Sequence, residues 1–196
     1  AYIVSQLKAK GNLIFGKVNL SEWAYYFCDD CPLGYSAVGG QTLNPYGRKV
    51  FESGGSSSGS GVAVAANYAV AAVGSETSGS ILSPSGHNAL VGCKPTIGLV
   101  SRTGIVPISS TLDTAGPMTK NVIDNAILLD AMQGKDASDL STTKAPSEIG
   151  DYIFASRNRS ISTYRLGAIK SLVKTDSLYR KAINTLRING AEVVEF

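Results

Sequence analysis

Serine and glycine are concentrated in two short stretches whose composition suits nucleophilic chemistry. The first, GGSSSGSG, runs from Gly54 to Gly61, and the second, GSETSGSILSPS, runs from Gly74 to Ser85. A serine hydroxyl becomes a nucleophile where a base takes its proton, and backbone N–H groups then stabilise the oxyanion that forms. Glycine allows backbone to approach a ligand closely because it has no side chain. The two stretches together therefore indicate a candidate nucleophile site.

Three other interpretations of the first stretch fit less well. A flexible linker is a poor match, because the buried apolar run VAVAANYAVAAV follows directly. A phosphate-binding loop needs Gly-Lys-Ser/Thr at its end, or a strand before it and an acidic residue after the next strand. Gly55 to Gly59 fits G-x-S-x-G, but that elbow needs a preceding hydrophobic strand and a late histidine. The single histidine, His87, precedes Asp113, and we interpret it as a structural residue.

Composition and charge exclude several classes of protein. The chain has 196 residues, 43% hydrophobic and 17% charged, which suits one globular domain or a piece of a larger one. Its net charge of +3 is spread along the chain, so neither nucleic acid nor a membrane surface is an expected partner. No apolar run reaches the roughly 18 to 20 residues of a membrane-spanning helix. The N-terminal AYIVSQLKAKG lacks the layout of a signal peptide, and we expect a helix entered part-way.

The cysteines favour a reducing compartment. Their number, three, is odd, which argues against a disulfide framework and predicts a cytoplasmic protein. Cys28 and Cys31 form a C-x-x-C, but Cys93 stands alone and a second metal-ligating pair is missing from the sequence. We therefore expect neither a metal nor a redox site at this pair.

Hydrophobic periodicity and turn residues predict alternating helices and strands. The expected helices are 2–7 ended at Gly11, a short one after an N-cap at Ser21, 62–69, 121–132 ended at Gly134, and 177–190. The expected strands are 13–18, 69–75, 164–170 and 191–196. Residues 29–55 are expected to form a long ordered loop, and 135–160 a polar surface connection. This order predicts an α/β fold, with a parallel sheet covered by helices on its faces.

The two stretches and the residues after them resemble the amidase signature family. Its hallmark looks like GGSSSGSGVAVAANYAVAAVGSETSGSILSPS, followed by VGCKPTIGLVSRTGIVPISSTLDTAGPMTKNV. The similarity is close over about residues 1–133, including GKVNLSEW and GGQTLNPYG, and looser at the YRLGAIK and GAEVVEF segments. The resemblance implies one partial amidase signature domain over 1–196, incomplete at both ends, with a mixed, largely parallel sheet flanked by helices.

The resemblance also implies an amide-cleaving Ser-Ser-Lys triad in place of Ser-His-Asp. Ser80 is the implied nucleophile, and Ser56, held by a cis peptide bond, is the implied bridging serine. In the family, the catalytic lysine lies upstream of anything that matches Ala1 to Gly11, so we expect this chain alone to be inactive. Lys17 and Lys94 match family positions without a catalytic role, and we interpret both as structural.

Further site residues follow from the same resemblance. Backbone N–H groups of Thr77, Ser78 and Gly79 are expected to form the oxyanion hole, where Gly79 should not tolerate substitution. Ser57 and Asp113 are expected to support the site from behind, with Asp113 accepting backbone donors that tie its loop to the serine stretch. Family members with acidic substrates can carry an arginine where this chain has Leu82, which favours a neutral or apolar substrate.

The expected reaction is hydrolysis of a small neutral amide to a carboxylate and ammonia or an amine. The resemblance implies no metal or organic cofactor, and the possible partners are a second copy in a homodimer or missing segments of the same enzyme. Two alternatives remain open. The first is an amidotransferase A-type subunit of a tRNA-dependent complex, although such chains usually look like GGSSGGS and DTGGSIRQPA in these loops. The second is a non-catalytic, truncated remnant.

Overall fold

The computed structural model describes residues 1–26, 29–144, 150–158 and 160–196. The chain divides into two compact units, Ala1–Ile153 and Phe154–Phe196, and each is considered by itself. That the whole chain forms one partial domain stays a prediction. Within the described ranges, no helix is long and apolar enough to cross a membrane.

The first unit is built around a three-stranded antiparallel sheet with the strand order β3-β5-β4. The central strand β5 (Thr114–Thr119) pairs along its whole length with β3 (Ala71–Glu76), and β4 (Val91–Gly92) pairs with its far end. The largely parallel sheet expected from the sequence is not confirmed here. The long connection between β3 and β5 brings the chain back in the opposite direction, which the order of elements alone did not reveal.

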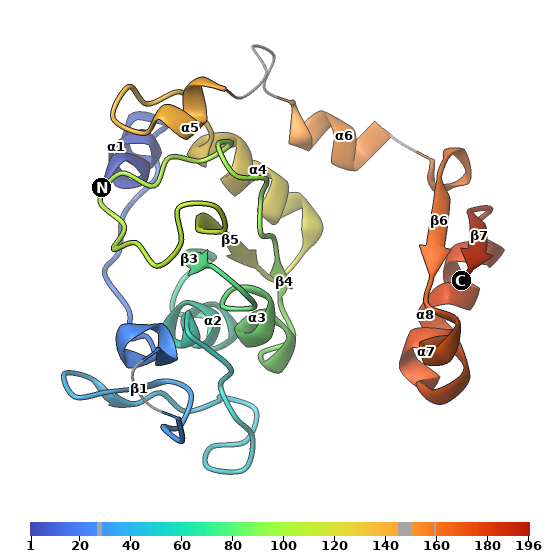
Figure 1. Ribbon diagram of the computed structural model, residues 1–196, viewed down its shortest axis with the longest axis horizontal. Coiled ribbons are helices and arrows are strands. Elements are labelled where there is room, and N and C mark those ends of the chain that lie inside the picture. The colour runs from blue at the N-terminus through green and yellow to red at the C-terminus, as the bar shows by residue number, and fades with distance from the viewer. Residues whose placement is uncertain (27–28, 145–149, 159) are drawn as a thin grey trace. The chain divides into compact units, whose positions relative to one another are not determined.

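Helices cover both faces of this sheet, so β5 is buried at every position. Helices α2 (Ser58–Ala65) and α3 (Leu82–His87) lie on one side of the strands, and α4 (Val122–Met132) lies on the other (Figure 1). Helix α1 (Tyr2–Ala9) packs against α4, and together they contribute most of the main hydrophobic core. The core cluster consists of Ile3, Leu7, Val100, Ala115, Leu128, Leu129 and Met132.

The predicted helices of this unit are largely confirmed. Helix α4 begins where its sequence signal indicates, because the Asn121 side chain accepts a hydrogen bond from the Asp124 N–H at 2.8 Å. Helix α2 begins earlier than expected, at Ser58 inside the glycine-serine stretch. Small residues permit this, since Gly59 and Gly61 are buried against neighbouring backbone that any side chain would displace. The stretch is therefore a packed helix start rather than a linker.

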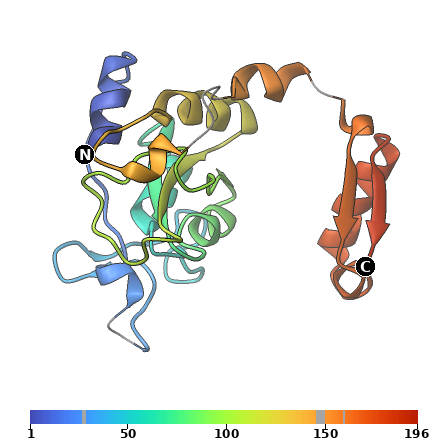
Figure 2. The same ribbon diagram turned by 45° about the horizontal axis from the view of Figure 1, so that its top comes forward.

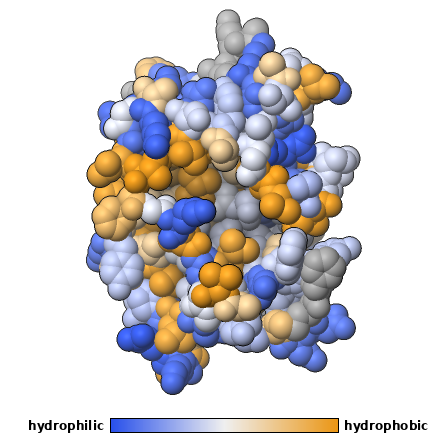
Figure 3. Space-filling model, turned by 90° about the vertical axis from the view of Figure 1, so that its left-hand side faces the viewer, coloured by the Kyte–Doolittle hydropathy of each residue, from blue (hydrophilic) through white to orange (hydrophobic). Residues whose placement is uncertain are grey.

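Two predicted elements near the N-terminus are wrong. Residues 13–18 form no strand and pair with none of the described strands, and Leu13 and Phe15 are 88% and 82% exposed. After them, SEWAYYF forms only a short 3₁₀ turn, η1 (Glu22–Tyr25), whose backbone is left-handed at Trp23 and Ala24. Ser21 caps no helix there, because its hydroxyl accepts a hydrogen bond from the Gly34 N–H at 2.7 Å. The face of the molecule shown in Figure 3 carries many apolar side chains.

The predicted loop 29–55 is ordered, as expected. It contains a small antiparallel hairpin of β1 (Tyr35–Ser36) and β2 (Gly40–Gln41). The Asn19 side-chain amide donates to the carbonyl groups of Gly34 and Gly40 and so fixes the hairpin to the preceding segment. Cys31 is disulfide-bonded, contrary to the expected reduced cysteines, and Cys28 lies outside the described residues. Cys93 is free and half-buried.

The predicted surface connection 135–160 is more structured than expected. It contains α5 (Leu140–Thr143) and α6 (Tyr152–Asn158), and 145–149 and 159 lie outside the described residues. Asp136, Asp139 and Thr142 are buried although they are polar, because hydrogen bonds satisfy them. Polarity of the sequence therefore did not mean exposure.

The second unit contains a β-α-α-β arrangement with a parallel strand pair. After η2 (Ile161–Thr163), β6 (Arg165–Ala168) pairs in parallel with β7 (Glu192–Glu195), and α7 (Lys170–Thr175) and α8 (Ser177–Ile188) connect them (Figure 2). The Asp176 side chain caps α8 by accepting from the N–H groups of Leu178 and Tyr179. Both predicted strands and the predicted helix are confirmed in this unit.

Candidate active site

A small pocket in the first unit brings together residues from four separate segments of the chain. It is lined by Ala24, Ser56, Ser75, Glu76, Thr77, Ser80, Ile105, Val106, Ile108, Asp113 and Thr114. Both predicted serines, Ser56 and Ser80, are therefore at one pocket, and Thr77 and Asp113 lie beside them. The backbone of two loops and one strand end positions these groups.

Ser57 joins the two serine loops. Its N–H donates to the Ser80 carbonyl at 3.1 Å. Its hydroxyl donates to the Ser75 carbonyl and accepts from the Ser75 N–H, both at 3.0 Å. Ser57 is also buried, so water does not compete for these bonds. Ser57, which was expected to support the site, thus joins the end of β3 to the start of α2 through hydrogen bonds.

Ser56 is held in place by its backbone. The Gly55–Ser56 peptide bond is cis, as the family resemblance implies. The Ser56 carbonyl accepts hydrogen bonds from the N–H groups of Ser21 and Ser58. Gly54 has φ +65°, and a side chain there would meet the Pro84 backbone at 2.7 Å. Among the described residues, neither the Ser56 nor the Ser80 hydroxyl has a hydrogen-bond partner, and both residues line the pocket.

The backbone around Ser80 was expected to form an oxyanion hole, and of the three residues predicted for it only Thr77 is among the described residues that line the pocket. The N–H groups of Ser78, Gly79 and Ser80 donate to no acceptor in the part of the chain that the structure describes. Gly79 has φ +83°, a conformation that residues with a side chain rarely adopt. A Cβ there would meet no atom within 4 Å, so backbone conformation, and not space, is the reason for glycine at this position.

Glu76, which we did not single out from the sequence, fixes the chain immediately after Ser80. One carboxylate oxygen, Oε2, accepts from the N–H groups of Ile81 at 2.6 Å and Leu82 at 2.9 Å. Glu76 is only 4% exposed. The sequence does contain a signal for this role, because an acidic residue stands at the end of an expected strand shortly before the candidate nucleophile. The backbone groups that it binds are identified only by the structure.

Asp113 ties a neighbouring loop to the segment that precedes Ser80. Its Oδ1 accepts from the Thr77 hydroxyl at 2.5 Å, and its Oδ2 accepts from the N–H groups of Ile108 and Ser109 at 2.8 Å. The backbone donors thus belong to its own loop rather than to the GGSSSGSG stretch, which differs from the expectation. Burial raises the pKa of Asp113, but these hydrogen bonds and the charge of Arg102 together outweigh it and lower the pKa.

The remaining singled-out residues lie outside the pocket lining. His87 contacts the Ser83 carbonyl through Nδ1 at 2.8 Å, which agrees with its interpretation as structural. Leu82, Lys17 and Lys94 do not line the pocket, and no lysine is among the described residues that do. Among the described residues, no group of His, Cys, Asp and Glu side chains is arranged to hold a metal ion. The groups present are suited to nucleophilic chemistry with a base that the pocket lining does not supply.

Comparison with known proteins decides the family. A family model described as Amidase matches residues 1–196. The chain belongs to the amidase family. It is 43% identical over 196 residues to a probable amidase of Arabidopsis thaliana, a match covering 99% of this chain and 38% of that relative. The native peptide amidase of Stenotrophomonas maltophilia is 45% identical, with a TM-score of 0.92, over all of this chain and 41% of that one.

Amidotransferase subunits are also among the relatives of this amidase chain. The A-type subunit of a glutamyl-tRNA(Gln) amidotransferase from Desulfosudis oleivorans is 37% identical over 202 residues, a match covering 100% of this chain and 40% of that relative. The chain thus spans about two fifths of the length of these proteins. The comparisons confirm the predicted family, and the solved relative shares the fold of this chain without confirming the predicted parallel arrangement of the sheet. They do not test the individual site residues, which stay predictions.

Proposed function

We propose that this chain is the nucleophile-bearing part of an amide hydrolase. The observation that carries the proposal is that Ser56 and Ser80 line one pocket, beside a segment whose Ser78, Gly79 and Ser80 N–H groups donate to no described acceptor. In the proposed reaction, the Ser80 hydroxyl attacks the amide carbonyl while Ser56 relays its proton towards a base. The backbone N–H groups then stabilise the tetrahedral oxyanion.

Collapse of that intermediate breaks the C–N bond and leaves an acyl group on Ser80. The leaving ammonia or amine takes up the proton that the base received, and water then hydrolyses the ester to give the carboxylate. The base is proposed to be a lysine in a part of the whole protein that this chain does not contain. The relatives support this, because they are more than twice as long as the matched chain. On this proposal the chain alone is inactive.

The proposed substrate is a small neutral amide. The pocket wall formed by Ala24, Ile105, Val106 and Ile108 is uncharged, and no basic side chain lines the described pocket to hold an acid. The carboxylates of Glu76 and Asp113 are engaged by N–H and hydroxyl donors. Similarity to a peptide amidase supports a peptide amide as a further substrate class to assay.

Other properties of the whole protein are part of the same proposal. A mixed, largely parallel sheet is proposed for the complete domain, with the parallel β6–β7 pair as one part of it. Its partners are further segments of the same enzyme or a second copy in a homodimer, rather than nucleic acid. A cytoplasmic location stays a prediction, and the disulfide at Cys31 weighs against it, since disulfides are rare in that compartment.

Substitution of the two serines in the whole protein tests the proposal. Ser80→Ala should reduce hydrolysis of neutral amides by about 10⁴-fold or more and should abolish labelling of this loop by a fluorophosphonate. Ser56→Ala should slow both reactions, while Ser171→Ala, an exposed serine of α7, should leave both unchanged. Retention of amide hydrolysis by Ser80→Ala would refute the nucleophile assignment.

A glutamine-dependent amidotransferase component is the second candidate, favoured by the 37% identity to such a protein. One assay separates the two candidates. Release of ammonia from glutamine only when a partner protein is added would establish the amidotransferase, whereas hydrolysis of simple amides by the whole protein alone would establish the amidase.

A further inference from the structure

One wall of the pocket is a separate loop, Arg102–Asp113, which will be called the wall loop. Three branched aliphatic residues of this loop, Ile105, Val106 and Ile108, line the pocket together with residues of the serines' own loops. Ile105 also packs against the main core cluster. Val106 and Ile108 stay 74% and 49% exposed although they are apolar. The pocket thus offers an apolar surface beside the candidate nucleophile, where an apolar group of a substrate could be buried.

The wall loop contains no helix or strand, so side-chain contacts hold its shape. At its C-terminal end, Asp113 accepts from the N–H groups of Ile108 and Ser109 and from the Thr77 hydroxyl. This contact fixes one side of the wall to the Ser80 loop. A second anchor holds the other side of the loop, in addition to the Tyr2 N–H, which donates to the Thr103 carbonyl at 3.1 Å.

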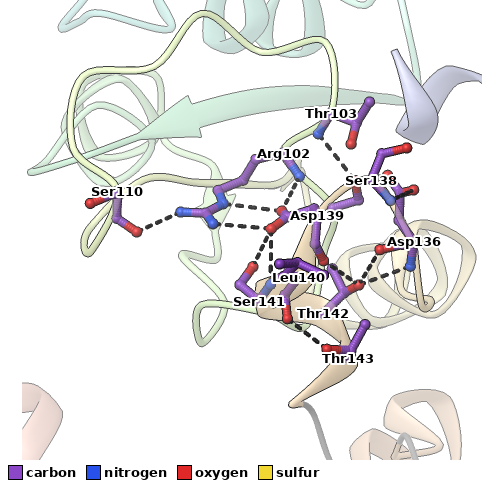
Figure 4. Close-up of polar contacts among 11 residues, drawn as sticks. Arg102, Thr103, Ser110, Asp136, Ser138, Asp139, Leu140, Ser141, Thr142 and Thr143 are labelled. Carbon is purple, nitrogen blue, oxygen red and sulfur yellow. Dashed lines mark hydrogen bonds and ion pairs between the residues drawn. The ribbon is translucent and has the colours of Figure 1, made fainter.

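Arg102 supplies that second anchor (Figure 4). Its Nε and backbone N–H donate to Asp139 Oδ2 at 3.1 and 2.9 Å, and Nη2 donates to Oδ1 at 3.0 Å. The remaining terminal nitrogen, Nη1, donates to the Ser110 carbonyl at 2.7 Å. A single guanidinium therefore connects the start of the wall loop, its far side at Ser110 and the N-cap of α5.

Asp139 is itself rigidly held. Its Oδ1 accepts from the N–H and the hydroxyl of Ser141, and its carbonyl accepts from the Thr142 hydroxyl. The hydrogen bond to Arg102 is the main cause of a strongly lowered Asp139 pKa, and the same contact raises the pKa of Arg102. Next to this pair, the Ser101 hydroxyl donates to Asp136 at 2.6 Å. The anchor is therefore a network rather than one exposed ion pair.

We propose that Arg102 is a positioning residue which, through Asp139 and Ser110, sets the wall loop to receive an apolar group of the substrate beside the scissile amide. This inference rests on the proposed amide hydrolysis and adds its specificity. Only arginine suits the position, because a planar fork of donors reaches a carboxylate and a carbonyl together, which the single ammonium of lysine does not. Arg102 does not touch the serines, so its loss should affect substrate choice more than the chemical step.

The test compares two amides in the whole protein. For wild type and for Arg102→Lys and Asp139→Asn, kcat and KM are measured with acetamide and with an unbranched longer amide such as hexanamide. Both variants should lower the kcat/KM ratio of hexanamide to acetamide about tenfold, mainly through KM, since contacts of one or a few methylenes are worth about 10- to 200-fold. The matched control is Arg165→Lys, which makes the same exchange at an exposed ion pair with Glu192 in the second unit and should leave the ratio unchanged.

Two further variants separate the possible failures. Val106→Ala and Ile108→Ala shorten the wall without touching its anchors and should lower the same ratio even if Arg102→Lys does not fold. An equal loss for both amides, or an unchanged ratio in all four variants, would overturn the inference. If wild-type protein hydrolyses neither amide and a fluorophosphonate does not label Ser80, then the proposed function fails and the inference fails with it.

Discussion

Glu76 offers the sharpest test of how the candidate nucleophile is positioned. Its carboxylate is the acceptor for the N–H groups of Ile81 and Leu82, directly after Ser80, and both Glu76 and Ile81 are buried. Removing the side chain in Glu76→Ala leaves these two N–H groups without their acceptor. Glu76→Gln keeps an oxygen acceptor but removes the charge. The two variants therefore separate the acceptor from its charge.

The magnitude follows from these two hydrogen bonds. Leaving a buried donor unsatisfied costs about 1 to 3 kcal/mol, so Glu76→Ala should cost about 2 to 6 kcal/mol in the stability of the Ser80 loop. Hydrogen bonds to charged groups contribute about 1.5 to 3 kcal/mol each, and neutral ones about 0.5 to 1.5, so Glu76→Gln should cost about 1 to 3 kcal/mol. A local change of about 1 to 3 kcal/mol corresponds to about a 5- to 160-fold change in the population of the open loop.

Hydrogen exchange of the Ile81 and Leu82 amides is the direct measurement, because exchange reports local opening. Both amides should exchange about 5- to 160-fold faster in Glu76→Gln and faster still in Glu76→Ala. Fluorophosphonate labelling of Ser80 in the whole protein should slow in the same order. Glu192→Gln serves as the control, since that carboxylate is exposed and pairs only at the surface with Arg165. Unchanged exchange in Glu76→Ala would refute the reasoning.

Three other predictions concern the loop, the core and acid stability. Gly79→Ala should slow Ser80 labelling, because the φ of +83° costs a residue with a side chain about 1 to 2 kcal/mol; wild-type labelling would contradict this. Met118→Ala should lower the free energy of unfolding in urea by about 2 to 5 kcal/mol through a cavity under fully buried β5, and a loss below about 1 kcal/mol would argue against tight packing. Asp113 and Asp139 have lowered pKa values in the folded chain. Their carboxylates therefore stabilise the folded state fully above the ordinary aspartate pKa of about 3.9, and this stabilisation is lost as the pH falls through the folded pKa values. Unfolding midpoints should therefore begin to drop as the pH falls below about 4 and continue to drop at lower pH, and less steeply in an Asp113→Asn, Asp139→Asn variant.

The predictable elements were those whose signals are local. Helix α4 has an apolar period and an Asn121 cap within its own sequence, and α8 has the same kind of signal with a glycine soon after its end. The strand predicted at 13–18 was wrong, because an apolar run forms a buried strand only if a partner strand lies beside it, and none of the described strands does. The antiparallel direction of β3 and β5 likewise depends on the path of a long connection, which has no local signature.

The candidate site was predictable in part for a similar reason. Ser56 and Ser80 stand in the two glycine-serine stretches that carry the family resemblance, and the structure places both at one pocket. Glu76 and Arg102 were not predicted as site residues. Glu76 binds backbone N–H groups that only the folded loop brings to it, and Arg102 binds groups that lie further along the chain. The Arg102–Asp139 contact joins the wall loop to the segment 135–160, whose polar sequence had predicted a surface connection.

The exposed apolar segment 13–18 affects how this chain should behave in solution when it is purified. LIFGKV is uncharged except for Lys17, and its backbone is paired with none of the described strands. Exposed, β-prone apolar segments of this kind favour pairing between molecules, and a single flanking charge gives limited protection. At high concentration the isolated chain should therefore self-associate through this segment. Phe15→Lys or Leu13→Glu would be a simple way to keep it monomeric for the exchange and labelling experiments.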